Sequence, residues 1–126
     1  RAHWATPVLI DGVLYGCSGR NEPDSDLRAV RFDTGEVFWT KRTHARSNVL
    51  ALSNAFLVID EYGLLQLIAA NPNRFELLHE MELSMPVQSG GRLIETPVWA
   101  PITLADGKLI LRGGRKLVAF NGVVAK

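Results

Sequence analysis

Histidine, cysteine and serine are the residues of this chain most able to bind a metal ion or to act as a nucleophile. His3, His44 and His79 lie far apart in the sequence and lack the short spacings of a metal site. Cys17 is the only cysteine, which excludes an internal disulfide and a cysteine-pair metal site, and we expect it to pack on a strand. Ser18 lies in no Gly-x-Ser-x-Gly motif. The sequence therefore predicts no catalytic residue and no metal ligand.

Aspartates and glycines are the next candidates for chemistry. Asp33, Asp60 and Asp106 lie at predicted turns, where an aspartate side chain hydrogen-bonds to the backbone. A glycine-rich phosphate loop opens a helix, whereas the segment Gly113-Gly114-Arg115 joins two predicted strands. These residues are predicted to form turns.

Composition and charge exclude several classes of partner. Fourteen Lys and Arg residues against thirteen Asp and Glu leave a net charge of +1, which is too balanced for a nucleic-acid-binding field. The apolar runs 55–59 and 64–70 are much shorter than the roughly 20 residues needed to span a bilayer. The chain begins at Arg1 without a charged and apolar leader, so we expect either a removed leader or an excised segment. A folded domain without a membrane span is predicted.

The elements that position these residues repeat three times along the chain. Each copy begins with two apolar runs separated by a two-residue turn, at Asp11-Gly12, Ser53-Asn54 and Asp106-Gly107. Asp-Gly between apolar runs is a strong hairpin signal, because a type I′ turn needs positive φ at both of its central residues. Each copy is therefore predicted to start with a β-hairpin.

Further apolar runs follow each hairpin. Third strands are predicted at 27–32, 64–69 and 117–120, and fourth strands at 37–41 and 75–83. The spacing of the copies, with the second lengthened around 83–95, is typical of propeller blades of four antiparallel strands. The predicted fold is all-β, a partial β-propeller of about three blades, at about 5–42, 46–84 and 97–126. The last blade lacks its outer strand, which the N-terminal end of a closed ring commonly supplies.

The segment Leu27 to Trp39 resembles the repeat motif of quinoprotein-like propellers, Ala-x-Asp-x-x-Thr-Gly-x-x-x-Trp. Ala29, Thr34, Gly35 and Trp39 match the motif, whereas Arg31 replaces its aspartate. The resemblance implies that Thr-Gly forms the turn between third and fourth strands and that the Trp docks against the neighbouring blade. A Thr-Gly pair suits a tight turn, and a tryptophan buries about 150 to 250 Å². The four residues are expected to dock one blade on the next.

Several runs are similar to bacterial repeat proteins of the quinoprotein-like or outer-membrane-barrel-assembly-like kind, namely Thr6-Pro7, Leu14 to Arg20, and Glu61-Tyr62-Gly63. The resemblance implies export to the periplasm or beyond, and a non-catalytic module for protein interaction or assembly without a cofactor. One alternative is part of a quinoprotein oxidoreductase with pyrroloquinoline quinone (PQQ), Ca²⁺ and an aspartate base. The vicinal cysteine pair of many such enzymes is absent. A second alternative is a propeller that binds a carbohydrate or another small molecule.

The long charged loop between the second and third strands of the first copy is the best candidate for recognition, because propellers carry recognition on such loops. We expect Arg20, Asn21 and Glu22, together with Trp4, to contribute to a polar partner surface. The partner is predicted to be another protein or further blades of the same polypeptide. Because three blades cannot close a ring, the isolated chain is expected to self-associate.

Overall fold

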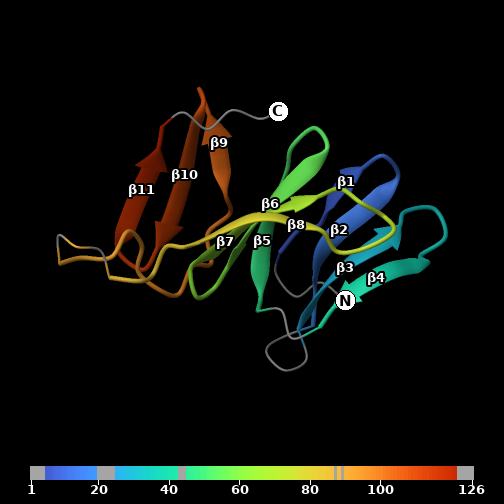
Figure 1. Cartoon of the computed structure of the whole chain (residues 1–126), viewed down its shortest axis with the longest axis horizontal. Coiled ribbons are helices and arrows are strands. Elements are labelled where there is room, and N and C mark those ends of the chain that lie inside the picture. The colour runs from blue at the N-terminus through green and yellow to red at the C-terminus, as the bar shows by residue number, and fades with distance from the viewer. Residues whose placement is uncertain (1–4, 20–24, 43–44, 87, 89, 122–126) are drawn as a thin grey trace.

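The computed structural model describes residues 5–19, 25–42, 45–86, 88 and 90–121, and within these ranges it contains eleven β-strands and no helix. Figure 1 shows the strands grouped in three separate sheets. Sheet 1 holds β1 (Val8–Ile10), β2 (Val13–Ser18), β3 (Asp26–Arg31) and β4 (Val37–Lys41). Sheet 2 holds β5 (Ser47–Ala51), β6 (Ala55–Asp60), β7 (Leu64–Ala69) and β8 (Leu77–Glu82). Sheet 3 holds β9 (Thr103–Ala105), β10 (Lys108–Gly113) and β11 (Lys116–Phe120).

Every sheet is an antiparallel meander in which each strand pairs with the next along the chain. Sheets 1 and 2 have four strands each, and sheet 3 has three within the described residues. This confirms the all-β prediction and agrees with the expected partial propeller, whose last unit has three strands among the described residues.

The hairpin turns that open sheets 1 and 3 have the predicted backbone. Asp11 and Gly12 have φ of 48° and 77°, and Asp106 and Gly107 have φ of 50° and 69°. These values are those of a type I′ turn, whose twist matches that of the flanking strands. The turn between β5 and β6 is different, because neither of its central residues has a positive φ, and it closes with a hydrogen bond from the Leu52 amide to the Ala55 carbonyl.

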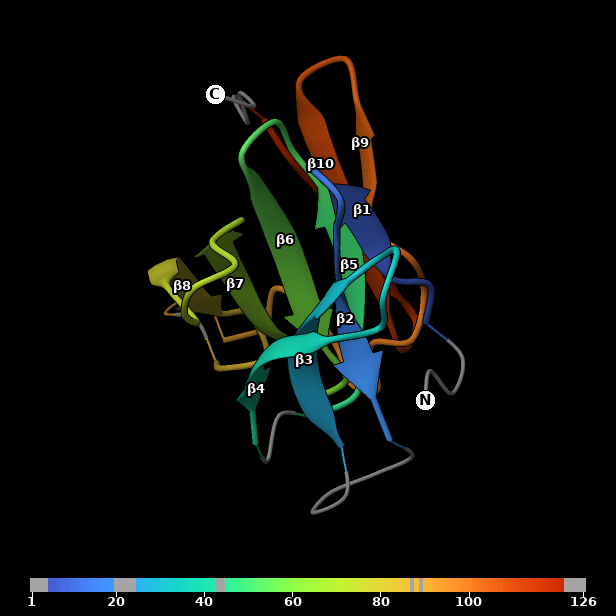
Figure 2. The ribbon, with the colours of Figure 1, turned by 90° about the vertical axis from the view of Figure 1, so that its right-hand side faces the viewer.

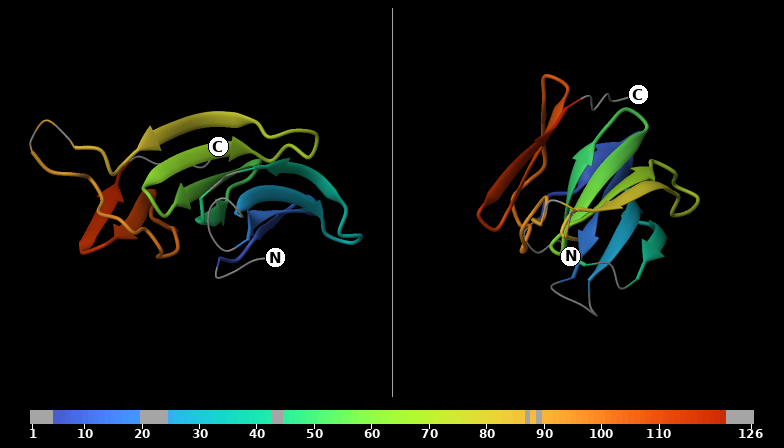
Figure 3. Two further views of the ribbon diagram at one scale, coloured as in Figure 1. Left: turned by 90° about the horizontal axis from the view of Figure 1, so that it is seen from below. Right: turned by 60° about the vertical axis from the view of Figure 1, so that its left-hand side comes forward.

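Sheet 2 lies between sheets 1 and 3, as Figure 3 shows from below. Strand β6 is buried at all six of its positions, because alternate side chains enter two different cores. The first core, between sheets 1 and 2, consists of Ile10, Val13, Tyr15, Leu27, Ala29, Phe56, Val58 and Ile68. The second core, between sheets 2 and 3, consists of Leu57, Ile59, Leu83, Ile94, Val98, Ile102, Leu109 and Leu111.

The turn between β3 and β4 contains the Thr34-Gly35 pair of the motif. Gly35 has a φ of 76°, which glycine adopts readily, and its amide donates to the Arg31 carbonyl at 2.9 Å. The Arg31 amide donates to the Glu36 carbonyl at 2.8 Å, and the Thr34 hydroxyl oxygen accepts from the Glu36 amide at 3.3 Å. Backbone bonds at Arg31 thus close the turn without the aspartate of the family motif.

Trp39 on β4 bridges sheets 1 and 2. Its indole Nε1 donates a 2.7 Å hydrogen bond to the backbone carbonyl of Asn71, which follows β7. Its ring lies 6.1 Å from the ring of Tyr15 in sheet 1 and 5.7 Å, edge to face, from that of Phe75 before β8. Ala29 is the residue opposite Trp39 in the β3–β4 register. The indole therefore couples the outer strand of one sheet to the outer turn of the next.

Replacing Trp39 by phenylalanine is expected to lower the free energy of unfolding by about 1 to 2 kcal/mol, because the Asn71 carbonyl loses its donor while most of the apolar contact remains. Urea unfolding followed by circular dichroism measures the change. Trp99→Phe is the matched control, since Trp99 is 55% exposed, and it should change stability little. Equal losses in the two variants would contradict a bridging role for Trp39.

Described parts of the connection between β8 and β9 pack between sheets 2 and 3. Leu83, Ile94 and Val98 are fully buried in the second core. The Ile94 amide donates to the Leu83 carbonyl at 3.2 Å, and the Val98 amide donates to the Glu61 carbonyl at 2.9 Å. Leu83 and Ile94, near the two ends of the lengthened part, therefore belong to the packing between sheets 2 and 3.

Candidate interaction surface

The predicted partner-binding residues Trp4, Arg20, Asn21 and Glu22 lie outside the described residues, so only the ends of their loop are seen. Ser18 and Asp26 face each other at the end of the β2–β3 pair. The Asp26 carboxylate, with its side chain 8% exposed, accepts hydrogen bonds from Arg28 Nε at 2.8 Å and Nη2 at 3.1 Å. The largely buried Asp26 carboxylate and its ion pair with Arg28 thus lie where the loop joins β3.

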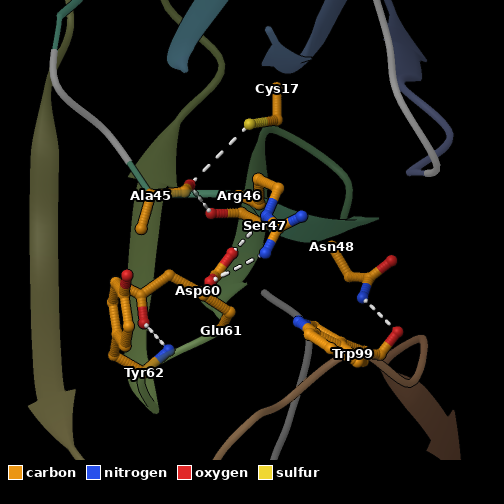
Figure 4. A network of polar contacts seen from close by, with 9 residues as sticks. All are labelled: Cys17, Ala45, Arg46, Ser47, Asn48, Asp60, Glu61, Tyr62 and Trp99. Carbon is orange, nitrogen blue, oxygen red and sulfur yellow. Dashed lines mark hydrogen bonds and ion pairs between the residues drawn. The ribbon is translucent and has the colours of Figure 1, made fainter. Parts of the chain in front are cut away.

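A network of polar contacts joins the start of β5, the β6–β7 turn and the segment before β9 (Figure 4). Arg46 Nε and Nη2 donate to the Glu61 carboxylate at 2.5 and 3.0 Å, with 20% and 12% of the two side chains exposed. The hydrogen bond to Glu61 raises the pKa of Arg46 above its usual value. The Arg46 guanidinium also lies 5.8 Å from the centre of the Trp99 ring. The partly buried pair thus joins the start of β5 to the β6–β7 turn within sheet 2, and Arg46 contacts the chain leading to sheet 3 at Trp99.

Asp60 supports the β6–β7 turn beside this pair. Its Oδ1 accepts hydrogen bonds from the amides of Tyr62 and Leu64, both at 2.9 Å. The turn-forming function predicted for Asp60 therefore matches its contacts. Gly63, between the two donors, has a φ of 93°, and the turn it forms leaves the Tyr62 ring 52% exposed.

Cys17 on β2 is half-buried beside the same network, and its Sγ lies 3.7 Å from the carbonyl oxygen of Ala45. Burial raises the pKa of the thiol, and the nearby carboxylates of Asp26 and Glu61 raise it further. Because the thiolate is the reactive form, this environment suppresses nucleophilic chemistry at Cys17 near neutral pH.

Alkylation of Cys17 by iodoacetamide at pH 8 is expected to be about ten-fold slower in the folded protein than in the same protein unfolded in urea. The pH at which the rate reaches half its maximum should also be higher in the folded protein, because a raised pKa leaves less thiolate at any given pH. Mass spectrometry of timed reactions across pH 7 to about 10 gives both quantities. Identical pH profiles for the folded and unfolded protein would contradict the prediction.

An open pocket of about 210 Å³ lies beside Trp99. The pocket is lined by Pro97, Trp99, Ala100, Arg112 and Gly114, which come from the segment before β9 and from the end of β10. A larger open depression of about 460 Å³ lies beside the Asp11-Gly12 turn. In that depression Arg31 Nε lies 3.6 Å from Asp33 Oδ1, and the Arg31 guanidinium lies over the Phe38 ring. The positive charge of Arg31 is therefore already paired within the protein.

As far as the described residues show, sheets 1 and 3 each have one face that contributes to neither core. On sheet 1 this end face carries Leu9, Leu14 and Val30, which are aligned across β1, β2 and β3, and Leu9 is 52% exposed. Figure 2 shows sheet 1 nearest the viewer, in front of sheet 2. On sheet 3 the end face carries Lys108, Ile110, Arg112 and Leu117, and Leu117 is 72% exposed. The two ends of the stack thus present apolar side chains to solvent.

Within the described residues, no group of three or more His, Cys, Asp or Glu side chains could hold a metal ion. His79 lies exposed on β8. No helix in the described part of the chain is long and apolar enough to cross a membrane.

Comparisons with known proteins do not identify a family. No protein-family model matches the chain, and a search of curated proteins gave no significant match. The quinoprotein-like resemblance of the segment 27–39 therefore stays a prediction, and the function has to be argued from the surfaces of the protein itself.

Proposed function

We propose that this chain is a non-catalytic β-propeller module that serves protein interaction or assembly, as part of a larger exported bacterial protein. The observation that carries the proposal is the unequal burial of the three sheets. Strand β6 of sheet 2 is buried on both faces, whereas among the described residues sheets 1 and 3 each contribute only one face to a core. The export and the bacterial source rest on the sequence resemblance alone.

The end faces support the proposal because each of them carries several apolar side chains. Leu9, Leu14 and Val30 on sheet 1, and Ile110 and Leu117 on sheet 3, are apolar residues at positions where a half-solvated sheet would carry polar side chains. Covering apolar surface stabilises by about 25 cal/mol per Å². The partner would be another protein or further blades of the same polypeptide, stacked as sheet 2 is stacked on sheet 1.

The open edge of sheet 3 supports the same conclusion. Within the described residues β11 has a neighbour on one side only, whereas the corresponding strands β3 and β7 are paired on both sides. Unpaired backbone groups on a strand edge favour pairing with another chain. A docked partner would supply both a covering face and an edge strand.

The test is the oligomeric state of the isolated chain, measured by sedimentation velocity from about 1 to about 200 µM. Without a partner, its end faces should cover one another, so we expect reversible, concentration-dependent association. Leu117→Asp places a charge on the end face of sheet 3 and should weaken association about ten-fold or more.

Leu78→Asp is the matched control, because Leu78 is 51% exposed on β8, the outer strand of sheet 2, and lies on neither end face. It should leave association unchanged. A chain that stays monomeric over the whole range would overturn the proposal. Equal weakening by both variants would show that association does not use the end face of sheet 3.

A further inference from the structure

Trp99 is held rigidly although its side chain is exposed. The side-chain Nδ2 of buried Asn48 donates to the backbone carbonyls of Trp99 at 3.1 Å and Ala100 at 3.2 Å. The preceding residue, Val98, is fully buried, and its amide donates to the Glu61 carbonyl. The backbone on both sides of the indole is therefore fixed to sheet 2, and Figure 4 shows the contact with Asn48.

The Trp99 indole contacts Arg46 and remains exposed to solvent. Arg46 lies 5.8 Å from the ring centre, and Glu61 holds that guanidinium in place with two hydrogen bonds. The Trp99 residue is still 55% exposed, and it borders the pocket that Arg112 and Gly114 line. A large side chain kept ordered and exposed loses little conformational entropy when a partner covers it.

Arg112 is an exposed cation without an anionic partner. Within the part of the chain that the structure describes, no carboxylate lies within ion-pair distance of it. Neighbouring cations are engaged, since Arg115 lies 3.8 Å from Glu95 and Lys116 Nζ donates to the Arg92 carbonyl at 2.6 Å. Arg112 is the charged residue of the pocket lining, so the pocket favours a negatively charged ligand.

We infer that Trp99 and Arg112 form a binding site for an extended peptide segment in which a carboxylate side chain lies next to an apolar one. The guanidinium of Arg112 would bind the carboxylate through two parallel hydrogen bonds, and the exposed indole would pack on the apolar side chain. Tryptophan and arginine are the residues most often found at the energetic centres of protein interfaces. The inference rests on the proposed function in taking the partner to be a protein.

The size and shape of the pocket favour a peptide over a free small molecule. Its volume of about 210 Å³ is below the roughly 300 to 1,000 Å³ of pockets that enclose small ligands. A single carboxylate and one neighbouring side chain fit a shallow site of this kind, while the rest of the segment continues across the surface. The end face of sheet 3, which carries Arg112, offers that surface.

The experiment uses the full chain and an end-blocked fluorescent peptide of sequence Gly-Leu-Asp-Leu-Gly, with its Asp→Asn analogue as the charge control. Binding is measured by fluorescence anisotropy. We expect the Asp peptide to bind, and Arg112→Gln and Trp99→Ala each to raise its Kd about ten-fold or more. The Asn peptide should bind weakly and equally to the parent and Arg112→Gln. Thermal unfolding checks that the variants are folded.

Lys108→Gln is the matched control, because Lys108 lies on the same strand and the same face as Arg112, about 13 Å away. It should change the Kd less than two-fold. An equal loss in Lys108→Gln would replace the site by a diffuse charge effect and overturn the inference. Unchanged binding in Arg112→Gln or Trp99→Ala would also overturn it.

Two further outcomes separate the inference from the proposed function. If the parent chain self-associates but does not bind the peptide, the peptide site at Trp99 and Arg112 is overturned and the proposed function is not. If 3-phenylpropionate binds in an Arg112-dependent manner and the peptide does not, the assignment to a peptide is wrong. A monomeric chain that binds the peptide supports the site and contradicts self-association.

Discussion

Replacing Phe56 by alanine is expected to lower the free energy of unfolding by about 3 to 5 kcal/mol. Phe56 on β6 is fully buried in the first core, and its ring stacks on that of Tyr15 with 4.7 Å between centroids and an angle of 30°. The truncation would remove the largest side chain that sheet 2 places against sheet 1, and a cavity would remain because both sheets are held by complete strand ladders.

Urea unfolding of the variant and the parent measures this loss. Phe32→Ala is the matched control, because Phe32 is 62% exposed beside the β3–β4 turn, and it should change the free energy of unfolding by about 0.5 kcal/mol or less. A loss below about 1 kcal/mol in Phe56→Ala would mean that sheets 1 and 2 do not pack through this ring.

The strands and most turns could be predicted from the sequence because their signals are local. Asp-Gly pairs between apolar runs fix the two type I′ hairpins, and the Thr34-Gly35 pair fixes the turn before β4. The run Ala55 to Ile59 is apolar without alternation, which suits a strand buried on both faces, and β6 is such a strand. The order of strands follows from the repeat itself, since each short connection forces neighbouring strands to pair.

The packing between sheets 2 and 3 could not be predicted, because its partners are far apart in the sequence. Asn48 reaches the carbonyls of Trp99 and Ala100, and Glu61 accepts from the Val98 amide. No local pattern in the sequence pairs these residues with one another. For the insertion around 83–95, the sequence showed only that this copy is longer than the others. The contribution of the insertion to the second core depends on how Ile94 packs against sheet 3.

The candidate site was also beyond the reach of local patterns. Sequence reasoning favoured the charged loop with Arg20, Asn21 and Glu22, since length and charge are visible in a sequence. The exposure of Trp99, and the fact that no carboxylate of the described residues pairs with Arg112, depend on tertiary packing. The Pro97-Val98-Trp99-Ala100-Pro101 run offered one usable signal, a tryptophan between two prolines that prevent it from joining a strand ladder.

Replacing Gly113 by alanine is expected to lower the free energy of unfolding by about 3 kcal/mol. Gly113 ends β10 and is buried against the segment before β9. An added Cβ would collide with the Glu95 carbonyl oxygen and lie 2.6 Å from Ile94 Cγ1 and 2.9 Å from Val98 Cγ2. Ile94 and Val98 are fully buried, so they cannot move aside without disturbing the second core.

Gly91→Ala separates this clash from the general effect of replacing a glycine, because a Cβ there would approach Lys116 Nζ at 3.8 Å and nothing nearer, and neither glycine has a positive φ. The control should therefore be neutral or slightly stabilising in urea unfolding, through its lower entropy in the unfolded chain. If Gly113→Ala were equally neutral, the segment 94–98 would not lie against β10. Because the same segment carries Trp99 and lies beside Arg112, a large loss at Gly113 together with an unchanged Gly91→Ala would support the packing that brings these two side chains into one pocket.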